Sequence, residues 1–270
     1  MSPESAEHFR VHGWMRVPSA FTADEAAAMR DAVWRVLATR GIRKGEPSSW
    51  SEERPVHLQA LKDDPVFRTP WSKQVIVAID EVLEGQAWQK PKSCGALFIA
   101  FPRKSAWNIP ASGWHIDANY TSELSPPAGV KVHALFGDVA QRGGGTQIVS
   151  GSHRVVHKWF KGHPPPTGTR GAEFRDLLKA HPYIRDLHTE GDPDARITRF
   201  KERVEEVDGI PLQVTENTGF AGDVILLHPL VLHVAAPNNG KEPRFLLSGG
   251  VDTDAMWGAY SGLRSSLTPE

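Results

Sequence analysis

The sequence predicts a mainly β protein with flanking α-helices, and three observations carry this prediction. The chain has 24 glycines and 21 prolines among its 270 residues, a turn-rich composition that favours short strands over long helices. Two segments in its first third repeat apolar residues with helical periodicity. The later apolar segments are short, strand-like and separated by Gly, Pro and Asn turns. We therefore expect a helical first third followed by a mostly antiparallel β core, in a single domain over residues 1–270.

The first helix is predicted to begin after Thr22. The stretch from Thr22 to Glu25 has the form of a capping box, and Gly41 is a stop signal. The apolar face of this helix consists of Met29, Ala32, Val33, Val36 and Leu37. Residues 13–21, "GWMRVPSAF", are expected to form a short strand and a turn before it.

A second helix is predicted from Ser72 to Gly85. Its apolar face consists of Val75, Ile76, Ile79, Val82 and Leu83. The strand-like segments that follow are residues 95–101, 130–139, 146–151, 223–235 and 244–251. No linker or long internal repeat divides the chain.

A polar stretch over about residues 157–212 interrupts the strands. It has one expected helix, near residues 172–180, and otherwise broken patterning. A connection of this length inside a compact domain is usually functional or mobile, so we interpret it as a lid over a site. The alternative is a decorated surface loop.

The bulk composition excludes several classes of protein. The formal net charge is −1, with acids and bases interspersed, so neither nucleic acid nor an anionic membrane is an expected partner. The single Cys94 excludes an internal disulfide and a multi-cysteine metal site. The first ten residues have no apolar signal core, and nowhere do 18 apolar residues run together. We expect a soluble, cytoplasmic protein.

The stretch "GWHIDANY", residues 113–120, contains the first two candidate metal ligands. On a strand, residues i and i+2 face the same side, so His115 and Asp117 present an imidazole and a carboxylate to one point. The pattern alone is weak, because 12 histidines and 32 acidic residues give about one His-x-Asp/Glu by chance. A second instance, His188 and Glu190, lies in the polar stretch and is interpreted as solvated.

The third ligand is expected from residues 223–235, which contain His228 and His233. Their odd spacing puts them on opposite faces of a continuous strand, so one of the two faces the site. Pro229 and the turn after the strand favour His233, and His228 remains the alternative. Two histidines and one carboxylate form the facial triad of non-haem iron(II) oxygenases, which leaves three metal positions open.

Arg244 lies 11 residues after His233, on what we expect to be the neighbouring strand. A guanidinium pairs bidentately with a carboxylate. Arg244 is therefore expected to anchor the far carboxylate of 2-oxoglutarate, whose keto-acid end chelates the metal. His133, on the predicted strand 130–139, is interpreted as a core histidine, with a substrate contact as the alternative.

With these residues in place, the chain resembles the phytanoyl-CoA dioxygenase-like (PhyH) family of iron(II)- and 2-oxoglutarate-dependent oxygenases. The resemblance covers most of the chain. It rests on "FRVHGWMRVPSAFTADEAAAMR", on "GWHID", on "GGGTQIVSGSH", and on "GDVILLHPLVLHVAAPN" with the later "PRF". It implies a double-stranded β-helix, a jelly-roll, cupin-like core with the iron at one mouth.

The resemblance also implies the roles of individual residues. His115, Asp117 and His233 would hold iron(II), Arg244 would clamp 2-oxoglutarate, and Thr146 would be a weaker second contact to it. The chain departs from the family at two positions, since Ala235 stands where members often have a small hydroxyl residue and Gly113 where some have Gln. Other contacts to 2-oxoglutarate therefore stay open.

The implied activity is a dioxygenase reaction that uses O2 and converts 2-oxoglutarate to succinate. Asp117 occupies the position that related halogenases leave empty, so hydroxylation or desaturation is expected in place of halogenation, and we expect hydroxylation of a small-molecule metabolite. One alternative is a non-oxidative metal-binding protein or an inactive relative on the same scaffold. Another is an oxygenase that acts on a protein side chain.

Overall fold

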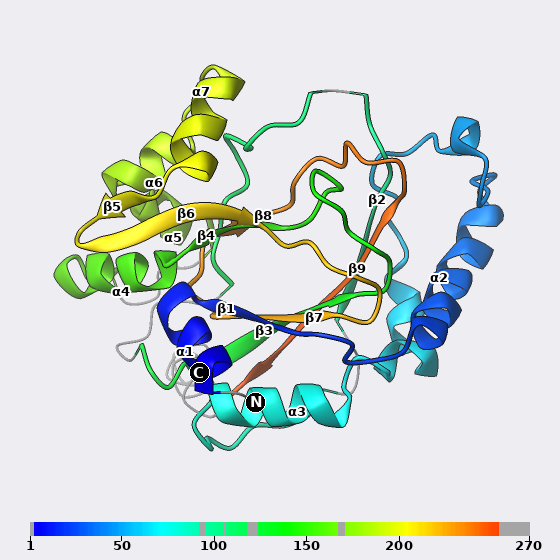
Figure 1. The fold of residues 1–270 in the computed structure, drawn as a ribbon, viewed down its shortest axis with the longest axis horizontal. Helices are drawn as coiled ribbons and strands as arrows, with labels where there is room; N and C mark the ends of the chain where they lie inside the picture. Colours follow the sequence, from blue (N-terminus) through cyan, green and yellow to red (C-terminus); the bar gives the residue numbers. More distant parts are fainter. Residues whose placement is uncertain (1–2, 92–94, 105, 118–123, 167–170, 254–270) are drawn as a thin grey trace, which may run out of the picture.

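Two antiparallel β-sheets, flanked by helices, form the protein in the computed structural model (Figure 1). The structure describes residues 3–91, 95–104, 106–117, 124–166 and 171–253. This architecture agrees with the predicted mainly β class with flanking α-helices. Within the described ranges, no helix has both the length and the apolar character required to cross a membrane.

The first sheet has five strands in the order β1-β7-β3-β9-β2. Their bounds are β1 (Trp14–Val17), β7 (Val224–Leu227), β3 (Gly129–Leu135), β9 (Arg244–Asp252) and β2 (Ala96–Ala100). The register sets His133 of β3 opposite Ser248 of β9, and Leu135 opposite Leu246. Because side chains alternate along a strand, these four residues share one face of the sheet, which we call its inner face.

The second sheet has four strands in the order β5-β6-β4-β8. Their bounds are β5 (Glu205–Val207), β6 (Ile210–Glu216), β4 (Gln147–Ser150) and β8 (His233–Val234). The prediction of one strand over residues 223–235 is wrong, because β7 ends at Leu227 and the chain crosses to the second sheet as β8. Pro229, which has no backbone N–H to donate to a ladder, lies in the connecting turn. The connection separates His228 from His233 in space.

Helices α1 (Pro3–His12), α2 (Ala23–Ala38) and α3 (Lys73–Val82) belong to the outer side of the five-stranded sheet. Short helical turns lie between α2 and α3: η1 (Pro47–Ser49), η2 (Gln59–Asp63) and η3 (Pro65–Arg68). Both predicted helices are confirmed, with a capping box at Thr22 and Glu25 and with Ser72 as the N-cap of α3. Their apolar faces pack against the outward side chains of β2, β3, β7 and β9 in one core cluster.

Helices α4 (Ser152–Gly162), α5 (Gly171–Leu178), α6 (Pro182–Leu187) and α7 (Pro193–Ile197), followed by a π-helical turn, η4 (Thr198–Glu202), gather beside the four-stranded sheet (Figure 1). Phe160, Ile184 and Leu187 are buried there with Val149 and Leu212 of the sheet. The stretch 157–212 is therefore more helical, and packs more apolar surface, than its broken patterning indicated. None of its described residues, 157–166 and 171–212, lines the cavity described below. Its role as a lid stays a prediction.

A smaller apolar cluster fills the space between the two sheets. It consists of Leu135, Val139, Ile148, Ile225, Leu227, Val231 and Leu246. Beyond this cluster the interior carries polar residues, among them His133 of β3, Ser248 of β9 and Thr146 just before β4. The change from apolar to polar side chains marks the end of the core where the candidate site lies.

Candidate metal centre

The backbone around His115 is held against the second sheet. Trp114 is buried in the apolar cluster between the four-stranded sheet and helices α4 to α6, and its indole N–H donates to the carbonyl of Pro110 at 2.7 Å. His115 and His233 form an isolated antiparallel bridge, with N–H to O distances of 3.1 and 3.0 Å. The predicted strand through His115 and Asp117 is thus reduced to one bridge. The amide of Asp117 then donates to the carbonyl of Pro229 at 3.0 Å, which fixes the carboxylate beside β8.

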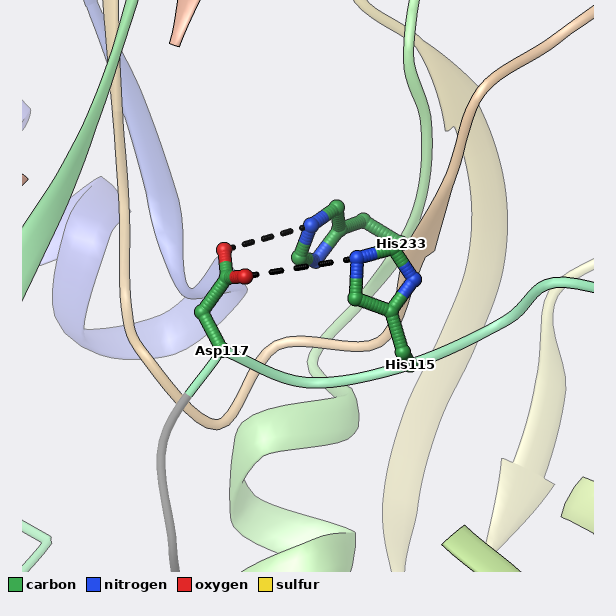
Figure 2. Close-up of side chains that lie close together, drawn as sticks. All are labelled: His115, Asp117 and His233. Atoms are coloured by element: carbon green, nitrogen blue, oxygen red, sulfur yellow. Dashed lines mark ion pairs between the residues drawn. The ribbon is translucent and has the colours of Figure 1, made fainter. Parts of the chain in front are cut away.

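Three of the predicted site residues converge: His115, Asp117 and His233. One potential ligand atom from each lies within 4.8 Å of the other two. Nε2 of His233 is 3.3 Å from Oδ2 of Asp117, and Nε2 of His115 is 4.0 Å from Oδ1. Figure 2 shows both imidazoles and the carboxylate pointing toward one another. No other His, Cys, Asp and Glu cluster of this kind occurs within the described part of the chain.

The other ring nitrogen of each histidine faces a backbone carbonyl. Nδ1 of His115 is 2.7 Å from the oxygen of Gly113, and Nδ1 of His233 is 3.1 Å from the oxygen of Val231. A carbonyl can only accept, so in the neutral ring Nδ1 carries the proton and Nε2 keeps its lone pair. Both lone pairs are therefore available to a metal ion, and the backbone sets this tautomer.

The electrostatics favour a neutral His115 and an ionised Asp117. Burial lowers the pKa of His115, and the neighbouring His233 lowers it further. Burial alone would raise the pKa of Asp117, but the hydrogen bond and charge that His233 provides in its protonated form, which a bound metal ion would replace, together with Lys131 and the protonated form of His115, hold it well below its usual value. Imidazole nitrogens without protons and a charged carboxylate are the forms that bind divalent transition metals.

The three groups open onto a cavity of about 180 Å³ between the sheets. Its lining consists of Ala96, Phe98, His115, Asp117, Lys131, His133, Thr146, His233, Ala235, Leu246 and Ser248. Thr146, predicted to be a second co-substrate contact, is buried and belongs to this lining. Larger cavities of about 450 and 470 Å³ lie elsewhere on the described surface, but no candidate metal cluster lines them.

Arg244 is buried on β9, in line with Leu246 and Ser248, which both line the cavity. Its Nη1 donates to the carbonyl of Gly144 at 2.8 Å, whereas its Nε has no described partner. Burial and the nearby Arg54 lower its pKa to about 10, so it is still a cation at neutral pH. The expectation that Arg244 and His233 lie on neighbouring strands is wrong, because β9 and β8 belong to different sheets. The two residues come from opposite sides of the interior.

His228, the alternative third ligand, lies away from the other two. Its Nδ1 accepts from the N–H of Leu230 at 3.1 Å, and its Nε2 donates to the carbonyl of Leu124 at 3.1 Å. Burial lowers its pKa to about 4. Both nitrogens are used by the backbone, so His228 has no lone pair to offer a metal.

Lys131 and Ser248 line the cavity, but the sequence did not lead us to predict them as site residues. The signal was present in "VKVHAL", where Lys131 and His133 alternate with outward-facing valines. Which face turns inward depends on pairing with distant strands, and the sequence alone does not give that pairing.

Comparison with known proteins shows the family of the chain. The family model described as phytanoyl-CoA dioxygenase (PhyH) matches residues 9–246. A comparison with curated protein sequences gives no match.

Solved structures with the same fold cover nearly the whole chain at low identity. The epimerase SnoN, in complex with Fe3+, α-ketoglutarate and nogalamycin RO, is 16% identical over 93% of this chain and 82% of its own, with a TM-score of 0.55. HygX from Streptomyces hygroscopicus, with nickel, 2-oxoglutarate and hygromycin B bound, is 15% identical over 94% and 88%, with a TM-score of 0.54. AviO1 from Streptomyces viridochromogenes Tue57 is 14% identical over 94% and 95%, with a TM-score of 0.54. At these identities the likeness shows a shared fold.

Proposed function

The chain belongs to the phytanoyl-CoA dioxygenase family, and on that premise we propose that it is an iron(II)- and 2-oxoglutarate-dependent dioxygenase that hydroxylates a small-molecule metabolite. His115, Asp117 and His233 hold the metal, while Arg244 and Thr146 hold the co-substrate. The observation that carries the proposal is the convergence of one ligand atom from each of three residues within 4.8 Å.

The donor set fits an iron(II) centre. Two imidazole nitrogens with free lone pairs and one ionised carboxylate occupy one side of a metal ion and leave the other positions for exogenous ligands. When bound, the ferrous ion and 2-oxoglutarate supply oxidation by O2, with decarboxylation of the co-substrate to succinate. The protein's residues orient these groups, and the two sheets that enclose the cavity limit access of water to them.

Arg244 fits the distal carboxylate of 2-oxoglutarate. A buried guanidinium with an unpartnered Nε and no carboxylate beside it in the described structure calls for an anion, because burying an uncompensated charge is costly. Thr146 directly precedes β4 and lines the cavity, with a hydroxyl suited to donate to that anion, whereas Arg244 is buried behind the lining, two residues before Leu246 on β9. We also assign the two facing sheets to a double-stranded β-helix, the jelly-roll, cupin-like core.

The solved structures support a small-molecule substrate. The solved structure of HygX contains hygromycin B with nickel and 2-oxoglutarate, and that of SnoN contains nogalamycin RO with Fe3+ and α-ketoglutarate. SnoN is named an epimerase, so this fold serves more than one oxidative outcome. Asp117 supplies a carboxylate ligand and leaves no place for a halide, which favours hydroxylation or desaturation over halogenation, and of these we propose hydroxylation.

The test has two stages. Anaerobic titration should show one Fe(II) per chain and binding of 2-oxoglutarate that depends on the metal. Addition of O2 with candidate metabolites should then yield succinate and hydroxylated product. Asp117→Ala should strongly weaken metal retention and strongly lower succinate formation, and His228→Asn is the matched control that keeps both. Metal binding without 2-oxoglutarate affinity would instead support the non-oxidative alternative.

A further inference from the structure

We infer that Lys131, with His133 and Ser248, forms an anchor for an oxyanion of the primary substrate, and that Phe98 contacts the apolar body of the same molecule. The inference rests on the proposed function and deepens it. It narrows the substrate class to small molecules that combine a carboxylate or phosphate with an apolar part.

The four residues form one wall of the cavity. The register of β3 and β9 pairs His133 with Ser248 and Lys131 with Gly250. On the other side of β9, β2 pairs Ala96 with Ser248 and Phe98 with Leu246. The metal ligands lie on the opposite wall, where His115 bridges to His233 on β8. The two walls meet where Lys131 contacts Asp117 and the ring of His133 contacts that of His233, so a ligand in the cavity lies beside both the metal ligands and this polar patch.

Lys131 supplies a charge that the loaded site does not balance. Its Nζ is 3.4 Å from Oδ2 of Asp117, and its side chain is 26% exposed toward the cavity. In the proposed holoenzyme, the dianionic co-substrate and Asp117 offset a divalent metal ion and Arg244. Asp117 is the one acidic residue among the described lining residues, so once it binds the metal, the carboxylate left near Lys131 is that of Asp252, which is exposed and lies outside the lining. A substrate anion would complete the balance.

His133 adds a second indication of a ligand. Its side chain is 4% exposed, it lines the cavity, and its Nδ1 has no hydrogen-bond partner in the described part of the chain. A buried polar atom without a partner is costly, so a missing ligand is a physical reason for it. A histidine ring carries at least one N–H, so His133 can donate one hydrogen bond to an anion in the cavity.

Phe98 supplies the apolar contact at the mouth. Its neighbours Leu97 and Ile99 are buried in the outer core, whereas Phe98 faces the cavity and is 46% exposed. An exposed aromatic ring beside a cation and two hydrogen-bonding groups suits a ligand with one apolar and one anionic end.

The anion is assigned to the substrate and not to 2-oxoglutarate on the basis of position. Arg244 and Lys131 share the inner face, but Arg244 lies at the start of β9 whereas Lys131 pairs with Gly250, six residues further along. One 2-oxoglutarate has its two ends on the metal and on Arg244, which leaves the Lys131 side of the metal for another molecule.

The test uses protein loaded with Ni(II) and saturating 2-oxoglutarate, which does not turn over. Calorimetry measures the binding of phenylacetate and of phenylacetamide, its neutral isostere. The acid should bind about tenfold more tightly than the amide. Lys131→Met should reduce acid binding to the level of the amide, Lys131→Arg should keep most of it, and Phe98→Ala should weaken both probes equally. Lys44→Met, a change to an exposed lysine paired with Asp31, should alter nothing.

Each other outcome overturns the inference. Equal binding of acid and amide, no saturable acid binding up to millimolar concentration, or unchanged acid binding by Lys131→Met would contradict the anchor. A tenfold loss of 2-oxoglutarate affinity in Lys131→Met, or competition of the acid with 2-oxoglutarate, would assign Lys131 to the co-substrate. Failure of the wild-type protein to load with metal and 2-oxoglutarate would count against the proposed function itself, a different result.

Discussion

Two pairs of histidines in this molecule have opposite surroundings. His115 and His233 face a cavity, with ring centroids 4.2 Å apart, and each uses Nδ1 on a carbonyl and leaves Nε2 beside Asp117. His153 and His228 are buried, with ring centroids 4.8 Å apart and no carboxylate between them in the described structure.

The difference shows that proximity of histidines does not define a metal site. Both ring nitrogens of His228 form hydrogen bonds with backbone groups, and Nε2 of His153 lies 3.1 Å from the carbonyl oxygen of Arg10. His228 and His233 are only five residues apart, so the turn after β7 decides which pair each one joins. A free Nε2 and a shared carboxylate distinguish the functional pair from the structural one.

The largest expected effect is on the rate of succinate formation, which should depend on the site of His115 and His233 and not on the pair of His153 and His228. Asp117→Ala removes the only carboxylate of the candidate centre and should lower the rate of succinate formation on the order of 1000-fold, since losing even a supporting residue of a metal site costs about 10- to 100-fold. His228→Asn, which keeps an oxygen to accept from Leu230, should lower it by no more than about threefold. Equal losses in the two variants, measured by succinate assay, would remove the distinction.

The next effect is on the free energy of unfolding at acidic pH, to which the buried His228 should contribute. Burial lowers the pKa of His228 to about 4. Above pH 6.5 the group is neutral in both states, and below it the unfolded chain takes up a proton that the folded protein excludes. Stability should therefore fall as pH drops from about 6.5 to 4, by about 3 kcal/mol from His228 alone. The free energy of unfolding, measured with denaturant at several pH values in this range, should depend less on pH in His228→Asn than in wild type. The same pH dependence in both proteins would contradict the assignment.

A smaller effect tests the cation across the interior from His233. Arg244→Gln should weaken binding of 2-oxoglutarate to the metal-loaded protein about 30-fold, as expected for loss of a charged hydrogen bond worth about 2 kcal/mol. Arg244→Lys should recover only part of this affinity, because an ammonium group cannot pair bidentately. Retention of wild-type affinity by the Gln variant would show that the co-substrate lies elsewhere.

The smallest effect is stabilisation by the metal itself. At a Ni(II) concentration ten times its dissociation constant, the unfolding free energy should rise by about 1.4 kcal/mol. Thermal melts should show this rise in wild type and in His228→Asn but not in His233→Ala. A rise of the same size in His233→Ala would place the bound metal outside the candidate centre.

Local patterns in the sequence predicted the elements whose signals are local. The capping box at Thr22 and the apolar periodicity after Ser72 gave α2 and α3, and alternation gave β2, β3 and β9. Helix α4 and strand β6 were missed, since the first begins at "SGSH" without a side-chain cap and the second was absorbed into the polar stretch. Their apolar residues become informative only once the second sheet is known.

The sequence predicted the three metal-ligand candidates of the site, but not the backbone elements that hold them. His115, Asp117 and His233 converge as expected, yet through one β-bridge and not through a strand. Lys131 and His133 could not be placed at the cavity from sequence, because their orientation depends on pairing with β9, more than 100 residues away. Long-range register is the information that a single sequence lacks.

The most direct test is an anaerobic crystal structure of the protein with Fe(II) and 2-oxoglutarate. We expect one metal ion bound by Nε2 of His115, Nε2 of His233 and an oxygen of Asp117, with the distal carboxylate of 2-oxoglutarate on Arg244. A metal ion held by other side chains, or a co-substrate remote from Arg244, would contradict the account.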